Sequence, residues 1–179
     1  TGDMFAYQHT GVTPDIMTIA KALGGGFPIG ACMATTEASK GMTAGTHGST
    51  FGGNPLAMAV GNAVLDVVAA DGFLDRMKKN ALLLKQRLAE LKDRHAAVIA
   101  EVRGEGLLMG LRMVPPVSEM VDELRAEKMI TVAAGDNVVR LLPPLIIGEH
   151  EISEAIARID RACTRLAQAH PRPAKQGAA

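Results

Sequence analysis

Cysteine is scarce in this sequence of 179 residues, which contains only Cys32 and Cys163. The two lie far apart and form no CxxC pair, so the sequence encodes neither a disulfide framework nor a zinc cluster. We therefore expect that no metal ion takes part in the function of this protein. We also expect a reducing, cytoplasmic compartment.

Two further shortages exclude other classes of protein. Lysine and arginine together number 19, as do aspartate and glutamate, so no net positive charge marks a nucleic-acid surface. The longest apolar run, residues 56–70, is interrupted by Gly61, Asn62 and Asp66. It falls short of the roughly 20 apolar residues that a membrane helix needs. We therefore expect neither nucleic acid nor a membrane as a partner.

Charge is also scarce in the first third of the chain. Residues 1–60 carry five charged side chains and residues 61–179 carry 33. A soluble surface typically has about 25–35% charged residues, so we expect an upstream segment, a partner subunit or both to cover this region. The alternative is a small, glycine-rich domain whose surface is polar but largely uncharged. The opening Thr1-Gly2-Asp3 resembles the middle of a longer protein, and we expect the chain to be a fragment.

The first region has the pattern of short strands and loops. Residues 16–20 and 29–35 are compact apolar runs, and each predicts a strand. Three glycines, residues 24–26, lie between them, where regular structure is hard to sustain. A polar loop of residues 43–53 leads to Asn54 and Pro55, which predict a helix cap and the first helical position.

The second region is more regular. Apolar residues at helical spacing predict helices over residues 74–91, 117–124 and 152–166. Strands are predicted over residues 98–102, 107–113, 130–133 and 138–142. We expect an α+β domain with helices on one face of a small sheet. The expected division is residues 1–66, residues 67–168 and a frayed tail of residues 169–179.

Lys21 is the first candidate for chemistry, because it is the only lysine before residue 40 and follows an apolar strand directly. Apolar surroundings disfavour a charged amine, and a neutral amine is a nucleophile for a carbonyl. The ends of strands in α/β sheets are also where ligands bind. The alternative is a lysine at the end of a strand that extends into water.

Ser49 and Thr50 lie in the glycine-rich loop before the predicted helix. Hydroxyls and free N–H groups at the start of a helix suit an anion, although capping and turn formation explain them equally well. Residues 24–26 also allow a phosphate to approach the backbone, but they match neither nucleotide-binding template and an ordinary turn is the alternative.

Two arginines accompany the second region. Arg103 is expected just after a strand and precedes Gly104, where a guanidinium suits a bidentate grip on a substrate carboxylate. A surface arginine at a hairpin is the alternative. Arg140 lies inside a predicted strand, and we regard it as structural or peripheral.

Together these segments resemble a known family. Residues 14–31, which include Lys21, resemble the lysine segment of class III pyridoxal-phosphate aminotransferases. Residues 46–57 and 102–107 resemble two further signatures, and residues 134–145 resemble the acetylornithine aminotransferase branch. The resemblance extends from Thr1 to about Leu166. It implies an α/β fold, with part of the large domain of a fold-type-I pyridoxal-phosphate transferase and a C-terminal α+β small domain.

The resemblance implies a role for each candidate residue. Lys21 would hold pyridoxal phosphate covalently and shuttle a proton at the substrate Cα. Thr50 would bind the cofactor phosphate in the partner subunit's site, and Ser49 would lie beside the substrate. Arg103 would clamp the carboxylate of glutamate, 2-oxoglutarate or the acetylated substrate. The enzyme would be a homodimer with its active site at the interface.

The reaction that the resemblance implies belongs to arginine biosynthesis. It is a ping-pong transfer of an amino group from N-acetylornithine to 2-oxoglutarate. A 4-aminobutyrate, ornithine or succinylornithine aminotransferase is the alternative within the family, and a non-catalytic remnant is the alternative outside it.

The resemblance also implies that part of the site lies ahead of Thr1. The family's aspartate at the pyridine nitrogen, its phosphate-binding Gly-Thr segment and the aromatic residue that stacks on the cofactor ring are all expected upstream. We therefore expect this chain to carry the lysine without the complete site.

Overall fold

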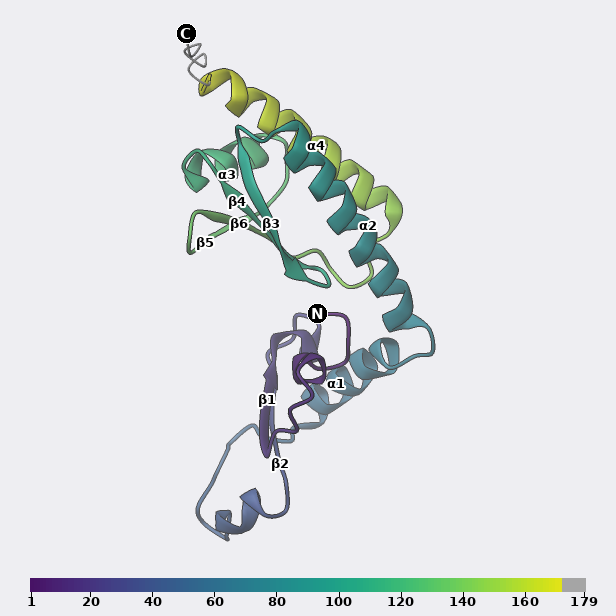
Figure 1. The fold of residues 1–179 in the computed structure, drawn as a ribbon. Coiled ribbons are helices and arrows are strands. Elements are labelled where there is room, and N and C mark those ends of the chain that lie inside the picture. The colour runs from purple at the N-terminus through teal and green to yellow at the C-terminus, as the bar shows by residue number, and fades with distance from the viewer. Residues whose placement is uncertain (172–179) are drawn as a thin grey trace. The chain divides into compact units, whose positions relative to one another are not determined.

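The computed structural model describes residues 1–171, which form two compact units (Figure 1). The N-terminal unit is Asp3–Leu74, and the C-terminal unit combines Thr1–Gly2 with the chain from Asp75 onward. The boundary expected after residue 66 falls inside helix α1 (Pro55–Val68). The expected tail begins at the last residue of helix α4 (Glu149–Ala169), and its residues 172–179 lie outside the described part. The three-part domain assignment stays a prediction.

The N-terminal unit contains a two-stranded antiparallel sheet. Strand β1 (Ile16–Ala20) pairs with β2 (Gly30–Ala34), and Thr18 lies opposite Cys32. The connections contain three short 3-10 helices, η1 (Ala6–His9), η2 (Lys21–Gly24) and η3 (Ala38–Gly41). Both predicted strands are confirmed to within one residue at each end.

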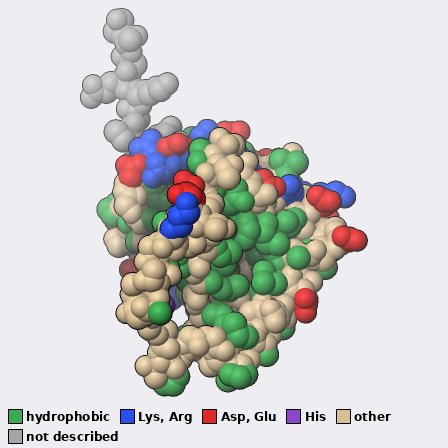
Figure 2. All heavy atoms as spheres, turned by 90° about the horizontal axis from the view of Figure 1, so that it is seen from below, with side chains coloured by type: hydrophobic (Ala, Val, Ile, Leu, Met, Phe, Trp, Pro, Cys, Tyr) green, Lys and Arg blue, Asp and Glu red, His purple; other side chains and the backbone are tan. Residues whose placement is uncertain are grey.

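Most apolar side chains of the N-terminal unit lie at the surface. All five residues of β2 are exposed, and Phe51 is 80% exposed. Among residues 3–74, the buried ones are Gly24, Ala57, Gly61 and Phe73. Figure 2 shows hydrophobic side chains reaching the surface over an area with few charges. The charge distribution predicts that other protein covers residues 1–60. The described residues do not supply that cover.

Helix α1 begins where the sequence predicts. The Asn54 Oδ1 accepts a hydrogen bond from the Ala57 N–H at 2.9 Å, and its Nδ2 donates to the Phe51 carbonyl at 2.8 Å. Pro55 is the first helical residue, a position where an N–H would have no partner inside the helix. The predicted cap is confirmed.

The C-terminal unit is built on a four-stranded antiparallel sheet in the order β3-β4-β6-β5. Its elements are α2 (Phe73–Arg94), β3 (Ile99–Glu105), β4 (Leu108–Met113), α3 (Val117–Ala126), β5 (Val132–Ala134), β6 (Val138–Leu141) and α4. On one face of the sheet Met109, Leu111 and Val139 are at most 1% exposed. The helices contribute buried Leu88, Leu91, Met120, Leu124, Ile152 and Ile159 to this core. The expected α+β fold is confirmed.

Ion pairs join α3 to α4 at the surface. The Glu127 carboxylate lies 2.7 Å from Arg161 Nη2 and 2.7 Å from Arg165 Nη1. Hydrogen bonds from Arg161 and then Arg165 hold the pKa of Glu127 below its usual value. Although Glu127 is only 14% exposed, the Arg161 and Arg165 side chains are 56% and 40% exposed. Solvent therefore screens these pairs, and exposed pairs typically contribute about 0–1 kcal/mol.

One side chain, that of Asn137, fixes the turn between β5 and β6. Its Oδ1 accepts a hydrogen bond from the Val117 N–H, and its Nδ2 donates to the carbonyls of Met113 and Pro115, each at 2.8 Å. Asp136 and Asn137 have left-handed backbones, with φ of 60° and 55°. Aspartate and asparagine tolerate this region better than most residues. The turn is thereby joined to the end of β4 and the start of α3.

Replacing Asn137 tests this arrangement. We expect Asn137→Ala to lower the free energy of unfolding by on the order of 1–3 kcal/mol, because three partly buried backbone groups lose their partner. Urea denaturation of the protein measures the change. Asn137→Gly is the matched control, because glycine keeps the left-handed backbone without strain. The loss common to both variants reports the hydrogen bonds, and wild-type stability in both would contradict the prediction.

Candidate functional site

Lys21 lies at the junction of β1 and η2 and has a left-handed backbone with φ of 51°. Such a conformation is uncommon for a residue with a long side chain and costs of order 1–3 kcal/mol. Strained residues cluster at functional sites, where the surrounding structure forces the conformation. Lys128, Asp136 and Asn137 share this conformation, so the strain supports the choice of Lys21 without singling it out.

A shallow hollow of about 450 Å³ adjoins Lys21 within the N-terminal unit. It is lined by Lys21, Ala22, Gly25, Gly26, Phe27, Pro28 and Ile29. A Cβ at Gly24 would lie 2.6 Å from Ile29 Cγ2, and Gly25 and Gly26 have φ of 55° and 114°. A side chain would therefore be obstructed at Gly24, and the left-handed backbones of Gly25 and Gly26 favour glycine. Residues 24–26 form a turn, and the approach of a phosphate to their backbone stays a prediction.

The surroundings of Lys21 differ from the expectation in one respect. The sequence predicts an amine held among apolar residues, but Lys21 is exposed in the described chain. Its neighbours in β1 and β2 are largely exposed as well. The apolar environment that favours a neutral amine is therefore not supplied by residues 1–171.

Ser49 and Thr50 are exposed in the loop that leads to α1. A Cβ at Gly52 would lie 2.9 Å from Ser49 Oγ, so the loop folds tightly around Ser49. Asn54 caps the helix, which leaves both hydroxyls available for another partner. Capping therefore does not explain these two residues.

Arg103 lies within β3 and not after it, because β3 continues to Glu105. The predicted strand end was wrong because Gly104, with φ of 129°, continues the pairing of β3 with β4. Its backbone lies so close to Leu108 that a Cβ on Gly104 would be 2.1 Å from the Leu108 carbonyl oxygen. Arg103 Nη1 lies 2.9 Å from Asp136 Oδ2 in the β5–β6 turn. Arg103 is therefore held by an acidic partner that its sequence position does not reveal.

Arg140 shares a face of the sheet with Arg103. Gly110 is opposite Arg103 in one ladder and opposite Arg140 in the next, so both arginines project from the face away from the core. Arg140 is exposed and forms no ion pair with a residue of the described range 1–171. Its interpretation as a structural or peripheral residue stays a prediction. In the sequence it is a single charged residue among four apolar ones in residues 138–142.

The candidates separate into two groups. Lys21, Ser49 and Thr50 belong to the N-terminal unit, and Arg103 and Arg140 belong to the C-terminal unit. The first group offers an amine and two hydroxyls, which suit a carbonyl and an anion. The second offers guanidinium groups, which suit a carboxylate.

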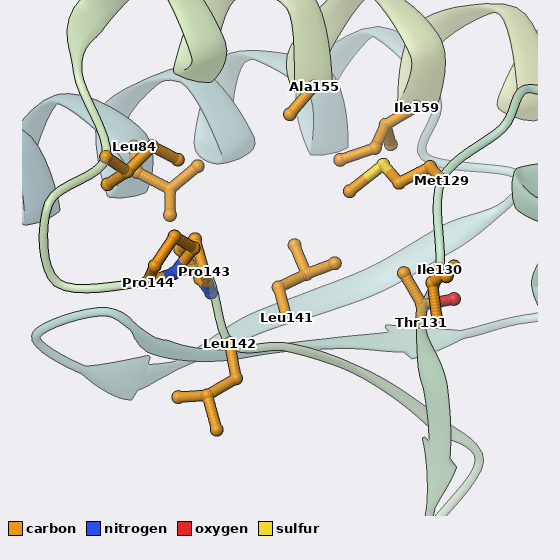
Figure 3. Close-up of a pocket in the computed structure, with 11 residues that line it drawn as sticks. Leu84, Met129, Ile130, Thr131, Leu141, Leu142, Pro143, Pro144, Ala155 and Ile159 are labelled. Carbon is orange, nitrogen blue, oxygen red and sulfur yellow. The ribbon is translucent and has the colours of Figure 1, made fainter. Parts of the chain in front are cut away.

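Other features offer less chemistry. A pocket of about 230 Å³ between α2, α4 and the segments around β5 and β6 is lined by apolar side chains and Thr131, with no titratable group (Figure 3). Burial raises the pKa of the Cys163 thiol to about 12, which makes it a poor nucleophile. Within residues 1–171, no cluster of three potential metal ligands occurs. No single helix in that range is long and apolar enough to cross a membrane.

Comparison with known proteins identifies the family. The model of the aminotransferase class-III family matches residues 1–163. The chain belongs to this family. Acetylornithine aminotransferase 1 of Bradyrhizobium diazoefficiens is 58% identical over 174 residues, covering 97% of this chain and 43% of the relative. The chain thus spans less than half the length of this relative.

Solved structures of this family share the fold. Acetylornithine aminotransferase of Elizabethkingia anophelis matches 92% of this chain and 42% of its own, with a TM-score of 0.84 and 33% identity. Ornithine aminotransferase of Toxoplasma gondii matches 95% of this chain and 41% of its own, with a TM-score of 0.88 and 31% identity. Both confirm the α/β fold expected for this part of a class-III aminotransferase.

Proposed function

We propose that the enzyme to which this chain contributes transfers an amino group between N-acetylornithine and 2-oxoglutarate. The observation that carries the proposal is the strained Lys21 at the end of β1, beside a hollow lined by two glycines and by apolar residues. It lies in a chain 58% identical to an enzyme named for acetylornithine.

The residues present fit part of a pyridoxal-phosphate site. Lys21 supplies a primary amine for the cofactor's aldehyde, and Thr50 supplies a hydroxyl for its phosphate near the start of α1. When bound, pyridoxal phosphate withdraws electrons from the substrate Cα. We assign the acidic partner of the cofactor ring to no residue of this chain.

Each residue then has a defined task. Lys21 would hold the cofactor and, once its amine is free, would take the proton from the Cα of the amino donor in one half-reaction and give a proton to the Cα derived from 2-oxoglutarate in the other. Ser49 lies beside the substrate, and Thr50 binds phosphate in the site of a partner subunit. Arg103 grips the carboxylate of 2-oxoglutarate, glutamate or the acetylated donor. The transfer runs as two half-reactions, so the donor product leaves before 2-oxoglutarate binds.

A homodimer with the active site at its interface explains the exposed surface of the N-terminal unit. The apolar side chains of β1, β2 and α1 require cover, which the rest of the large domain and a partner subunit supply. Such cover also removes water from around Lys21 and favours its neutral amine. We place this dimer in the cytoplasm, consistent with the free Cys32 and Cys163.

Ornithine is a second candidate donor. The structure matches an ornithine aminotransferase with a TM-score of 0.88, slightly above the 0.84 of the acetylornithine enzyme. The 58% sequence identity to an acetylornithine enzyme favours the acetylated donor, because side chains rather than the backbone select substrates. 4-Aminobutyrate and succinylornithine are two further candidate donors. The remaining hypothesis is a non-catalytic remnant without turnover.

Turnover with different donors tests the substrate. We expect the full-length enzyme with pyridoxal phosphate and 2-oxoglutarate to have its highest kcat/KM with N-acetylornithine. Ornithine, N-succinylornithine and 4-aminobutyrate are the comparison donors, and glutamate release is measured for each. A higher kcat/KM with one of these would transfer the assignment to that substrate. Absence of turnover with all four would favour the remnant.

Borohydride reduction tests the role of Lys21. We expect the reduced full-length enzyme to carry a phosphopyridoxyl group on the peptide containing Lys21, as identified by mass spectrometry. Lys21→Ala should lose this label and turnover while keeping its circular dichroism spectrum. Lys40→Ala is the matched control, because Lys40 is an exposed lysine of the same unit and should leave the label in place. Labelling elsewhere, or turnover by Lys21→Ala, would contradict the assignment.

Separate alanine variants test the carboxylate clamp. We expect Arg103→Ala to raise KM for 2-oxoglutarate strongly, because losing a charged hydrogen-bonded pair costs on the order of 2–5 kcal/mol. Steady-state kinetics of the full-length enzyme measure the change. Arg140→Ala is the informative comparison, because Arg140 shares the same face of the sheet without an acidic partner in the described range. A large increase in KM for 2-oxoglutarate in Arg140→Ala alone would show that Arg140, and not Arg103, binds the carboxylate.

A further inference from the structure

Helix α1 packs against the short helix η2, whose first residue is Lys21. We infer that Gly61 of α1 is a positioning residue, which holds η2 in place so that the Lys21 backbone keeps its left-handed conformation. This inference rests on the proposed role of Lys21 and extends it to a residue that has no part in the proposed reaction. Both residues belong to the N-terminal unit.

The contact between α1 and η2 is where the N-terminal unit has a packed interior. Gly24 of η2 and Ala57 and Gly61 of α1 are three of the four buried residues in the range 3–74. Ala57 and Gly61 are four positions apart, so they lie on the same face of α1. The strands of this unit are largely exposed by comparison. Within the described chain, this face of α1 is therefore the firmest support available to η2.

The side chain of Ile29 connects Gly61 to η2. A Cβ at Gly61 would lie 3.5 Å from Ile29 Cδ1, and a Cβ at Gly24 would lie 2.6 Å from Ile29 Cγ2. Ile29 thus contacts the bare backbone of both helices, and it also lines the hollow beside Lys21. A larger side chain at position 61 would press on Ile29 and, through it, on the end of η2.

Val64 makes a second contact from the same helix. A Cβ at Gly25 would lie 3.0 Å from Val64 Cγ2. Gly25 follows η2 directly and has a left-handed backbone, as Lys21 has at the start of η2. A strained backbone persists only where its surroundings over-determine it. The contacts of Gly61 and Val64 hold a helix of four residues, so they restrain Lys21 at its other end.

Two substitutions at position 61 of the full-length enzyme test this role. Gly61→Val forces Ile29 to move, because a β-branched side chain in a helix has little freedom to turn away. We expect the dissociation constant of pyridoxal phosphate, measured by visible absorbance with the cofactor-free enzyme, to rise roughly 10- to 30-fold. The reason is that a lysine without this restraint rarely has a left-handed backbone. Borohydride labelling of Lys21 at a fixed cofactor concentration should fall in parallel.

Gly61→Ala is the matched control. Its Cβ would be at ordinary contact distance, 3.5 Å, from Ile29 Cδ1, so the dissociation constant and the label should stay at their wild-type values. Alanine and valine both favour a helix more than glycine does, so helix propensity does not explain a loss in Gly61→Val.

A compensating variant separates positioning from simple destabilisation. Ile29→Val removes Cδ1, the atom nearest to Gly61, and should restore most of the cofactor affinity in the Gly61→Val background. Two substitutions that merely destabilise the unit would add their effects, and the melting temperature of the cofactor-free enzyme reports that case. A double variant that binds the cofactor no better than Gly61→Val overturns the inference.

Val64→Ala decides the question if Gly61→Val does not fold. It removes the methyl groups beside Gly25 and should raise the same dissociation constant several-fold with an unchanged circular dichroism spectrum. Wild-type affinity in Val64→Ala, or in a folded Gly61→Val, overturns the inference while a label on Lys21 of the wild-type enzyme keeps the proposed function. A wild-type enzyme without a label on Lys21 overturns both.

Discussion

Burial of one face of the four-stranded sheet is the constraint on which the C-terminal unit depends. Met109, Leu111 and Val139 on that face are almost fully buried together with the apolar stripes of α2, α3 and α4. Side chains alternate across a strand, so fixing this face also fixes the opposite one. Arg103 and Arg140 project from the opposite face because β3 and β6 are packed in this register. The core thereby decides where the polar groups of this unit point.

The N-terminal unit obeys the same requirement in a different way. Its strands are as apolar as core strands, but the described residues leave them exposed. A strained backbone persists only where the surroundings over-determine it. Within the described chain, the β1–β2 ladder and the turn of residues 24–26 restrain the backbone of Lys21. Cover from the remainder of an enzyme would complete the restraint, and it would also change the solvation of the lysine amine.

Local patterns in the sequence predicted most elements, and the failures have identifiable physical causes. The strand ending at Ala20 and the cap at Asn54 depend on neighbours within a few residues, so both were predictable. The predicted end of β3 was too early, because the Gly104-Glu105-Gly106 segment is typical of a turn but Gly104 and Glu105 continue the strand. The partner of Arg103 lies 33 positions further on, in a turn whose position depends on the sheet order. The face of the sheet on which Arg140 lies could not be predicted for the same reason, since it is set by pairing with β4.

The sequence by itself determined the family, the candidate lysine and the division between a charge-poor and a charge-rich region. These features depend on residue types and on spacing along the chain, which are fully present in the linear order. Only the tertiary structure decided that Lys21 has a left-handed backbone and is exposed. Only the tertiary structure brought Asp136 to Arg103 and left Arg140 without an acidic partner in residues 1–171. Strain, exposure and pairing between distant residues arise from packing, because they depend on which segments lie together once the apolar faces are buried.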